Sequence, residues 1–211
     1  MTTRTFIRQA RLLDPASGLD EVGDLMIEDG RIAARAPALG LAPDTEIIDG
    51  SGLCLAPGLV DMRVQLREPG AEHQETMQTG AAAAAAGGVT TLVALPTTRP
   101  VIDDVALVEF VARRSRDIGL VNIRTYAAAT QGLRGQELTE MGLLAAGGAL
   151  GFTDGTAAIA EARVMRRALS YARTFDQLIL QHPEEPSLAA GGAMNEGEIA
   201  TRLGLHGIPA A

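Results

Sequence analysis

The chain has 211 residues, 46% of them hydrophobic, with a net charge of −8 at pH 7 and a single cysteine. This length and apolar content permit a sizeable buried core, and the negative charge argues against a general nucleic-acid-binding surface. Because Cys54 is the single cysteine, the chain has no internal disulfide, and we expect Cys54 to be an apolar strand residue. Because the chain lacks a membrane-length apolar run and the N-terminus lacks a secretion signal, we expect a cytoplasmic protein.

Residues 1–56 are predicted to form a small β domain. Asp29-Gly30 lies between two apolar runs, which is a strong hairpin signal because both residues accept the backbone angles of a tight turn. The expected strands of this domain cover residues 5–13, 24–34 and 46–55.

Residues 57–211 change to alternating strands and helices, which predicts a parallel sheet with helices on its outside. The expected strands cover 59–66, 89–95, 122–128, 149–153 and 178–182. The expected helices cover 75–86, 104–117, 136–146, 157–173 and 196–203. The glycine pairs 87–88 and 147–148 follow two of these helices, where a left-handed cap is expected.

The number of strand–helix units is about five, whereas a (β/α)₈ TIM barrel needs eight units and about 250 residues. We therefore expect the N-terminal part of a longer barrel protein. Without the remaining units, the last strand would expose an unpaired apolar edge, so a partner or further chain should cover it.

Polar residues that end or follow the predicted strands are the candidates for chemistry, because active sites of such barrels lie at the C-terminal ends of their strands. On the first strand, the two-residue repeat places Arg63, Gln65 and Arg67 on one face. The full set is Arg63, Gln65, Arg67, Thr97, Asp154 and His182.

The segment from Pro57 to Gly70, PGLVDMRVQLREPG, resembles the first barrel strand of the dihydroorotases, where it reads PGLVDMHVHLREPG. The segment from Ala83 to Pro100, AAAAGGVTTLVALPTTRP, resembles that family's AAAAGGFTTVAAMPNTxP, and GFTDG at 151–155 resembles its GFTDDG. The resemblance covers essentially the whole chain. It implies an α/β protein of the metal-dependent amidohydrolase superfamily, with a (β/α)₈ TIM barrel and a small N-terminal β-sandwich.

The same resemblance implies roles for the candidate residues. Arg67 corresponds to an arginine that holds the substrate carboxylate, and Thr97 replaces a substrate-binding asparagine. Asp154 and His182 correspond to metal ligands. Arg63 and Gln65 replace the two histidines that bind zinc in the family. The family's general base, an aspartate, and a further metal histidine are expected beyond Ala211.

Zinc binding is expected to be absent or weak. Catalytic zinc takes three protein ligands and a water molecule, whereas Arg63 has no free lone pair and Gln65 is a weak ligand. The positive charge of Arg63 would also repel the zinc ion. Two like unit charges at ~4 Å repel by about 4 kcal/mol at an effective dielectric near 20, and the double charge of zinc roughly doubles this energy. We hypothesise that the Arg63 guanidinium occupies the vacated space and pairs with Asp154.

Plainer interpretations of the same residues stay open. His182 could be a hydrogen-bonded residue at a strand end, and Asp154 could cap the helix that follows it. Arg63 could be a salt-bridged barrel residue, and Arg67 could brace Glu68 or Asp154. Each would carry no role in binding or catalysis.

Two functions are compatible with the sequence. One is a non-catalytic dihydroorotase homologue, acting as a structural or regulatory partner of aspartate transcarbamoylase in an oligomer and still able to bind a small carboxylate. The other is a zinc-dependent cyclic amidohydrolase that converts dihydroorotate and water to N-carbamoyl-L-aspartate. The loss of both histidines and of the asparagine favours the first. For both functions, we expect no binding to nucleic acid or to membranes.

Overall fold

The computed structural model describes residues 4–40 and 45–210. The chain divides into two compact units, Met1–Gly58 and Leu59–Ala211. In the part of the chain that the structure describes, every helix is too short or too polar to cross a membrane.

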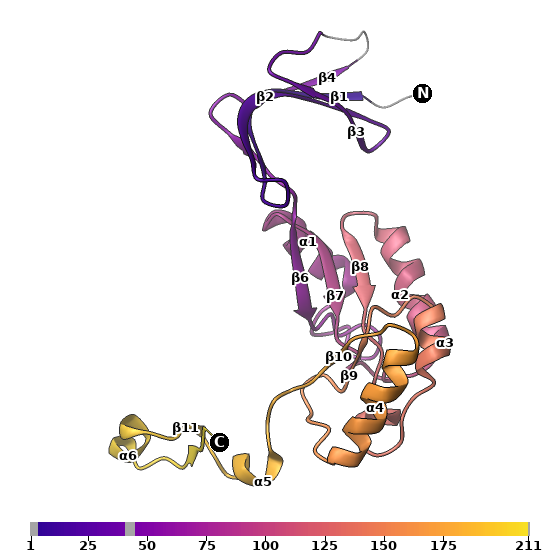
Figure 1. Cartoon of the computed structure of the whole chain (residues 1–211), viewed down its shortest axis with the longest axis vertical. Helices are drawn as coiled ribbons and strands as arrows, with labels where there is room; N and C mark the ends of the chain where they lie inside the picture. Colours follow the sequence, from indigo (N-terminus) through magenta and orange to yellow (C-terminus); the bar gives the residue numbers. More distant parts are fainter. Residues whose placement is uncertain (1–3, 41–44, 211) are drawn as a thin grey trace. The chain divides into compact units, whose positions relative to one another are not determined.

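The first unit is one five-stranded sheet, coloured indigo to purple in Figure 1. Asp29-Gly30 forms the predicted hairpin turn, with positive φ angles of 49° and 74°. The single strand expected over 46–55 is instead two short strands, because a turn at 51–52 separates them, and Cys54 in the second is exposed. The strands are β1 (Arg4–Asp14), β2 (Leu19–Glu28), β3 (Arg31–Ala36), β4 (Glu46–Asp49) and β5 (Cys54–Leu55).

This sheet is mixed. β1 pairs with β2 antiparallel and with β4 and β5 in parallel, and β3 continues the sheet beyond β2. Its buried apolar side chains form a separate small core made of Ile7, Ala10, Leu12 and Leu25.

The second unit contains five parallel strands in sequence order, as expected for the first part of a barrel. β6, β7 and β8 pair side by side, and β9 pairs with β10 (Figure 1). A parallel bridge between Ala127 and Phe152 links the two groups. The strands are β6 (Leu59–Val64), β7 (Val89–Ala94), β8 (Asn122–Thr125), β9 (Phe152–Thr153) and β10 (Ile179–Leu180).

Helices pack on these strands and close a common apolar core. Thr76 and Asp104 cap the first two helices by accepting hydrogen bonds from backbone N–H groups of the first turn. Small residues such as Ala81 and Ala168 are fully buried, so the alanine-rich helices approach the sheet closely. The helices are α1 (Met77–Ala86), α2 (Val105–Ile118), α3 (Met141–Ala146) and α4 (Ala162–Thr174).

Several predicted boundaries were wrong. The helix expected over 136–146 begins only at Met141, and residues 131–133 form a short 3₁₀ turn, η1 (Gln131–Leu133). In the two glycine pairs, only the second member has a positive φ, 76° at Gly88 and 106° at Gly148. The C-terminal part adds α5 (Pro186–Ala189), β11 (Met194–Asn195), α6 (Glu198–Leu203) and β12 (Gly207–Ile208).

Candidate functional site

The loops that follow the five barrel strands are joined to one another by direct contacts. The backbone N–H of Arg99 donates to the carbonyl of Pro69 at 3.0 Å, which joins the first two loops. The backbone N–H of Ala128 donates to the carbonyl of Ile102 at 2.8 Å. Gln181 exchanges two hydrogen bonds with the backbone of Ile159, at 3.3 and 3.4 Å. The segments that carry the candidate residues therefore form one connected surface.

The first strand is shorter than its sequence pattern predicts. β6 ends at Val64, so Gln65 and Arg67 lie in the loop beyond it, and the shared strand face extends only to Arg63. The backbone N–H of Arg63 donates to the Asp61 carboxylate at 2.9 Å. Arg67 has a φ of 59°, a left-handed conformation that is uncommon outside glycine.

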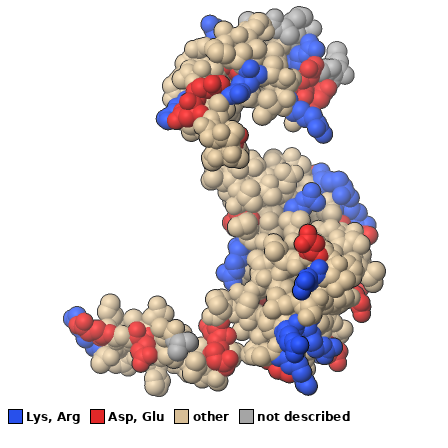
Figure 2. Space-filling view, viewed as in Figure 1, with Lys and Arg blue, Asp and Glu red and all other residues tan. Residues whose placement is uncertain are grey.

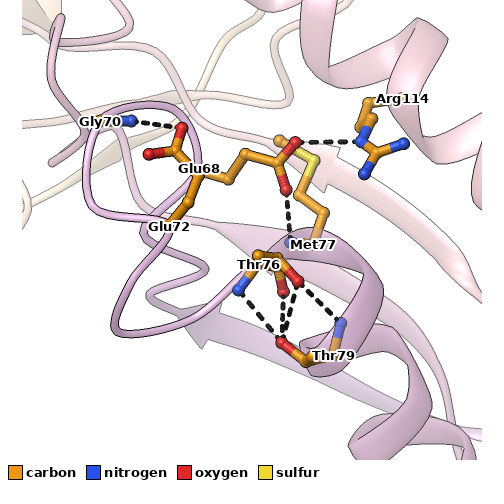
Figure 3. Close-up of polar contacts among 7 residues, drawn as sticks. All are labelled: Glu68, Gly70, Glu72, Thr76, Met77, Thr79 and Arg114. Atoms are coloured by element: carbon orange, nitrogen blue, oxygen red, sulfur yellow. Dashed lines mark hydrogen bonds and ion pairs between the residues drawn. The ribbon is translucent and has the colours of Figure 1, made fainter.

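Glu68 holds this loop in place. Its side chain is largely buried, and its two carboxylate oxygens accept hydrogen bonds from the Met77 backbone N–H at 2.7 Å and from Arg114 Nε at 2.9 Å (Figure 3). Met77 is the first residue of α1, where backbone N–H groups have no partner within the helix. Glu68 thus connects the loop after β6 to the start of α1 and to α2. Among the described residues, no ion pair joins Arg67 to Glu68 or to Asp154, so the bracing interpretation of Arg67 was wrong.

Asp154 is 2% exposed, and both of its carboxylate oxygens accept hydrogen bonds. Oδ1 accepts the backbone N–H groups of Ala129 and Thr130 at 3.1 and 2.9 Å, and Oδ2 accepts the Thr130 hydroxyl. Burial raises the pKa of the Asp154 carboxyl above its usual 3.8, and the hydrogen bonds from Thr130 and Ala129 act in the opposite direction.

These contacts correct two expectations for Asp154. The hypothesised pair with Arg63 was wrong, because Thr130 and the backbone take both carboxylate oxygens and no ion pair of Arg63 occurs among the described residues. The helix-cap alternative was also wrong, since α4 begins at Ala162, eight residues later, and its N-cap is Glu161. Thr130 was missed by sequence reasoning; the only signal for it is that a buried aspartate needs donors.

Thr97 lies against the loop that carries Asp154. A side-chain Cβ built on Gly155 would come within 2.4 Å of Thr97 Cγ2, and Gly155 has a φ of 69°. The structure therefore brings Thr97 and the Asp154 loop together. It also explains why position 155 is glycine here, where GFTDDG has its second aspartate.

His182 lies two residues beyond the end of β10 and is half-buried. Its nearest charged neighbour is Glu184, with Nε2 and Oε2 3.7 Å apart. That separation is too long for a hydrogen bond. In the described part of the chain, no cluster of three or more histidine, cysteine or acidic side chains is arranged to hold a metal ion.

Comparison with known proteins decides the family. The family model for dihydro-orotase-like proteins matches residues 52–211. A dihydroorotase of Solibacter usitatus is 46% identical over 205 residues, covering 97% of this chain and 47% of that protein. One of Syntrophobacter fumaroxidans is 44% identical over 208 residues, covering 97% and 47%. The chain belongs to the dihydroorotase-like family.

Solved structures agree on the fold. The L-hydantoinase (dihydropyrimidinase) from Arthrobacter aurescens aligns with a TM-score of 0.74 at 19% identity, covering 89% of this chain and 42% of that one. A dihydroorotase structure aligns with a TM-score of 0.60 at 16% identity, covering 87% and 52%. The fold of this dihydroorotase-like chain is therefore that of the TIM-barrel amidohydrolases. The chain spans about half the length of the curated relatives it matches.

At the two positions that the resemblance matches to zinc-binding histidines, Arg63 offers only N–H donors and Gln65 offers a neutral amide. The Asp154 oxygens are already hydrogen-bonded to Ala129 and Thr130. Of the corresponding residues in this chain, His182 alone keeps a free metal-binding nitrogen as its side chain stands.

Proposed function

We propose that this chain is a dihydroorotase homologue of pyrimidine biosynthesis that has lost its zinc site and serves as a structural or regulatory subunit. The observation that carries the proposal is the pairing of Asp154 with Thr130, in a chain where Arg63 and Gln65 stand at the positions of the two zinc histidines. Without the metal there is no activated water to attack the ring amide of dihydroorotate. What is left in the barrel mouth is the capacity to bind.

The binding capacity would centre on Arg67. A guanidinium presents a planar fork of N–H donors that matches a carboxylate. The Glu68 contacts to α1 and α2 hold the adjacent backbone, so that Arg67 is presented from a fixed loop. Thr97 offers a single hydroxyl in place of an amide. We propose that a small carboxylate binds here without being turned over.

The partner we propose is aspartate transcarbamoylase, in a mixed oligomer. Support comes from the resemblance to the dihydroorotases. Co-purification from cells tests this at working concentrations. Recovery of the transcarbamoylase with this chain supports the partner role, and its absence from the purified complex contradicts it.

A second function, catalytic dihydroorotase, is favoured by one specific observation. The chain is 46% identical to a dihydroorotase over nearly its whole length, and it keeps residues corresponding to one metal histidine and the substrate arginine. In that case the remaining ligands and the general base would come from the rest of the barrel.

An assay of N-carbamoylaspartate cyclisation with added zinc separates the two functions. Our proposal predicts no turnover above the uncatalysed rate. Turnover that needs zinc and is abolished by His182→Ala would establish the catalytic alternative. His206→Ala is the matched control, because it removes an exposed histidine that is not among the candidate residues.

A further inference from the structure

A cavity of about 950 Å³ lies between α4 and the segment 131–140. It shares no residue with the candidate site above. α4 contributes positions i, i+3, i+4, i+7 and i+8, which form one face of a helix. The opposite face of α4 is buried in the core through Val164, Ala168 and Ala172. The face toward the cavity consists of Arg163, Arg166, Arg167, Ser170 and Tyr171.

Two of these arginines have no ionic partner among the residues that the structure describes. Arg163 pairs with Glu161 at 3.0 Å, but both side chains are at least half exposed. Arg166 and Arg167 make no ion pair or side-chain hydrogen bond within the described residues. Figure 2 shows the resulting cluster of positive side chains over α4. Because the chain contains no lysine, every positive side chain in this view is an arginine.

The opposite wall carries acceptors. Glu137 and Glu140 line the cavity from the loop side, and Glu140 accepts a hydrogen bond from the Tyr171 hydroxyl at 3.3 Å. No ion pair crosses the cavity between the two walls among the described side chains. The cavity therefore keeps a cationic wall and an anionic wall apart, and its volume lies in the range of small-molecule sites.

We propose that this cavity binds a phosphomonoester that also carries hydroxyl or amino groups, the chemistry of a nucleotide or a sugar phosphate. Arg166 and Arg167 present guanidinium forks, which bind phosphate oxygens in pairs. Glu137 accepts hydrogen bonds from the hydroxyl or amino groups at the other end, and the Tyr171 ring offers a flat apolar surface between them. This inference does not depend on whether the barrel mouth is catalytic.

Calorimetric titration of the 211-residue chain tests the proposal, at one low ionic strength because exposed charges are screened by salt. The probes are adenosine 5′-monophosphate, adenosine and inorganic phosphate. We expect the monophosphate to bind more tightly than either part alone. Arg166→Ala/Arg167→Ala should weaken it by about tenfold or more, and Glu137→Gln should weaken the monophosphate but not inorganic phosphate.

The matched control is Arg113→Ala/Arg116→Ala, which removes two exposed arginines from α2 and should leave binding unchanged. Far-ultraviolet circular dichroism verifies that each variant is folded. Equal weakening by the two double variants would show attraction to net charge alone and would overturn the site. Failure of the monophosphate to bind at millimolar concentration, or binding no tighter than that of inorganic phosphate, would overturn it as well.

Discussion

Gly155 and Thr97 are coupled by their contact. A Cβ at position 155 would lie 2.4 Å from Thr97 Cγ2, and the φ of 69° disfavours any L side chain. Gly155→Ala should therefore destabilise the chain by the left-handed strain, roughly 1–2 kcal/mol, and by the steric contact. Thr97→Ser removes only the Cγ2 methyl group, so it should recover the steric part in the double variant.

Urea unfolding of the wild type, both single variants and the double variant measures this coupling. We expect a non-additive term of about 0.5 kcal/mol or more. If the two changes in the free energy of unfolding were additive, the Thr97 side chain would be free to move away from a Cβ at position 155. If the coupling holds, restoring an aspartate at position 155 requires a change at position 97 too.

Sequence reasoning selected candidate side chains at this scale but did not predict their contacts. The strand-end rule selects Asp154 and His182 without any structural knowledge. The Arg63–Asp154 pair was predicted from the opposite charges of the two side chains. In the folded chain, the Thr130 hydroxyl and two backbone N–H groups lie next to Asp154 and donate hydrogen bonds to it instead. Matching opposite charges in a sequence does not reveal neutral hydrogen-bond donors of this kind, because their positions depend on the fold.

In the N-terminal sheet, Asp24 supports an irregularity in β1. The register of β1 with β2 shifts between Ile7 and Ala10, and Gln9 at this point has a φ of 54°. The Asp24 carboxylate accepts the backbone N–H groups of Gln9 and Leu39, each at 2.9 Å. The hydrogen bonds from Leu39 and Gln9 lower the pKa of Asp24 below 3.8.

A lowered carboxyl pKa stabilises the folded state above the unfolded value, and this stabilisation is lost as the pH falls through the folded value. Asp24→Asn should therefore lower the stability of the sheet at neutral pH and reduce its further loss below pH 3.8. Thermal unfolding followed from about pH 6 to about pH 2 measures both effects. Asp117→Asn is the control; an identical pH profile for the two variants would contradict the role of Asp24.

The loop after β6 depends on Glu68. Replacing it by alanine frees the Met77 N–H and the Arg114 guanidinium, at a cost of about 2 kcal/mol. Arg114→Ala should cost less, because Arg114 is partly exposed, and Arg113→Ala on the solvent side should cost nothing measurable. Unfolding free energies test this order, and hydrogen exchange at the Met77 amide should rise only for Glu68→Ala. An unchanged exchange rate of the Met77 amide in Glu68→Ala would show that Glu68 does not connect the loop after β6 to α1.

Helices and strands could be predicted where apolar residues recur periodically. The residues at which they begin and end could not be predicted. Residues 136–140 follow a helical pattern, yet tertiary contacts hold them in an irregular, non-helical conformation. The Thr139 hydroxyl donates to the Ala128 carbonyl at 2.7 Å, and the Gln131 N–H donates to the Glu137 carbonyl at 2.8 Å. These bonds connect segments on either side of η1, so local propensity does not reveal them.

For the whole chain, the exposed side of β6 predicts association. Leu59, Val60 and Met62 are 62%, 58% and 65% exposed, and strands with an open apolar edge pair with other chains. We expect concentration-dependent self-association or capture of a partner. Val60→Lys/Met62→Lys should reduce it, whereas Leu143→Lys on exposed α3 should not. Sedimentation velocity measures this, and a monomer at every concentration would contradict it.

We propose that the zinc site has been lost because Arg63 and Gln65 stand where the dihydroorotases have two zinc-binding histidines. The most direct test of this proposal is elemental analysis of the chain purified with added zinc and then dialysed. We predict well below one zinc per chain, and an increase in the Arg63→His/Gln65→His variant. About one zinc per wild-type chain, lost in His182→Ala, would contradict the account.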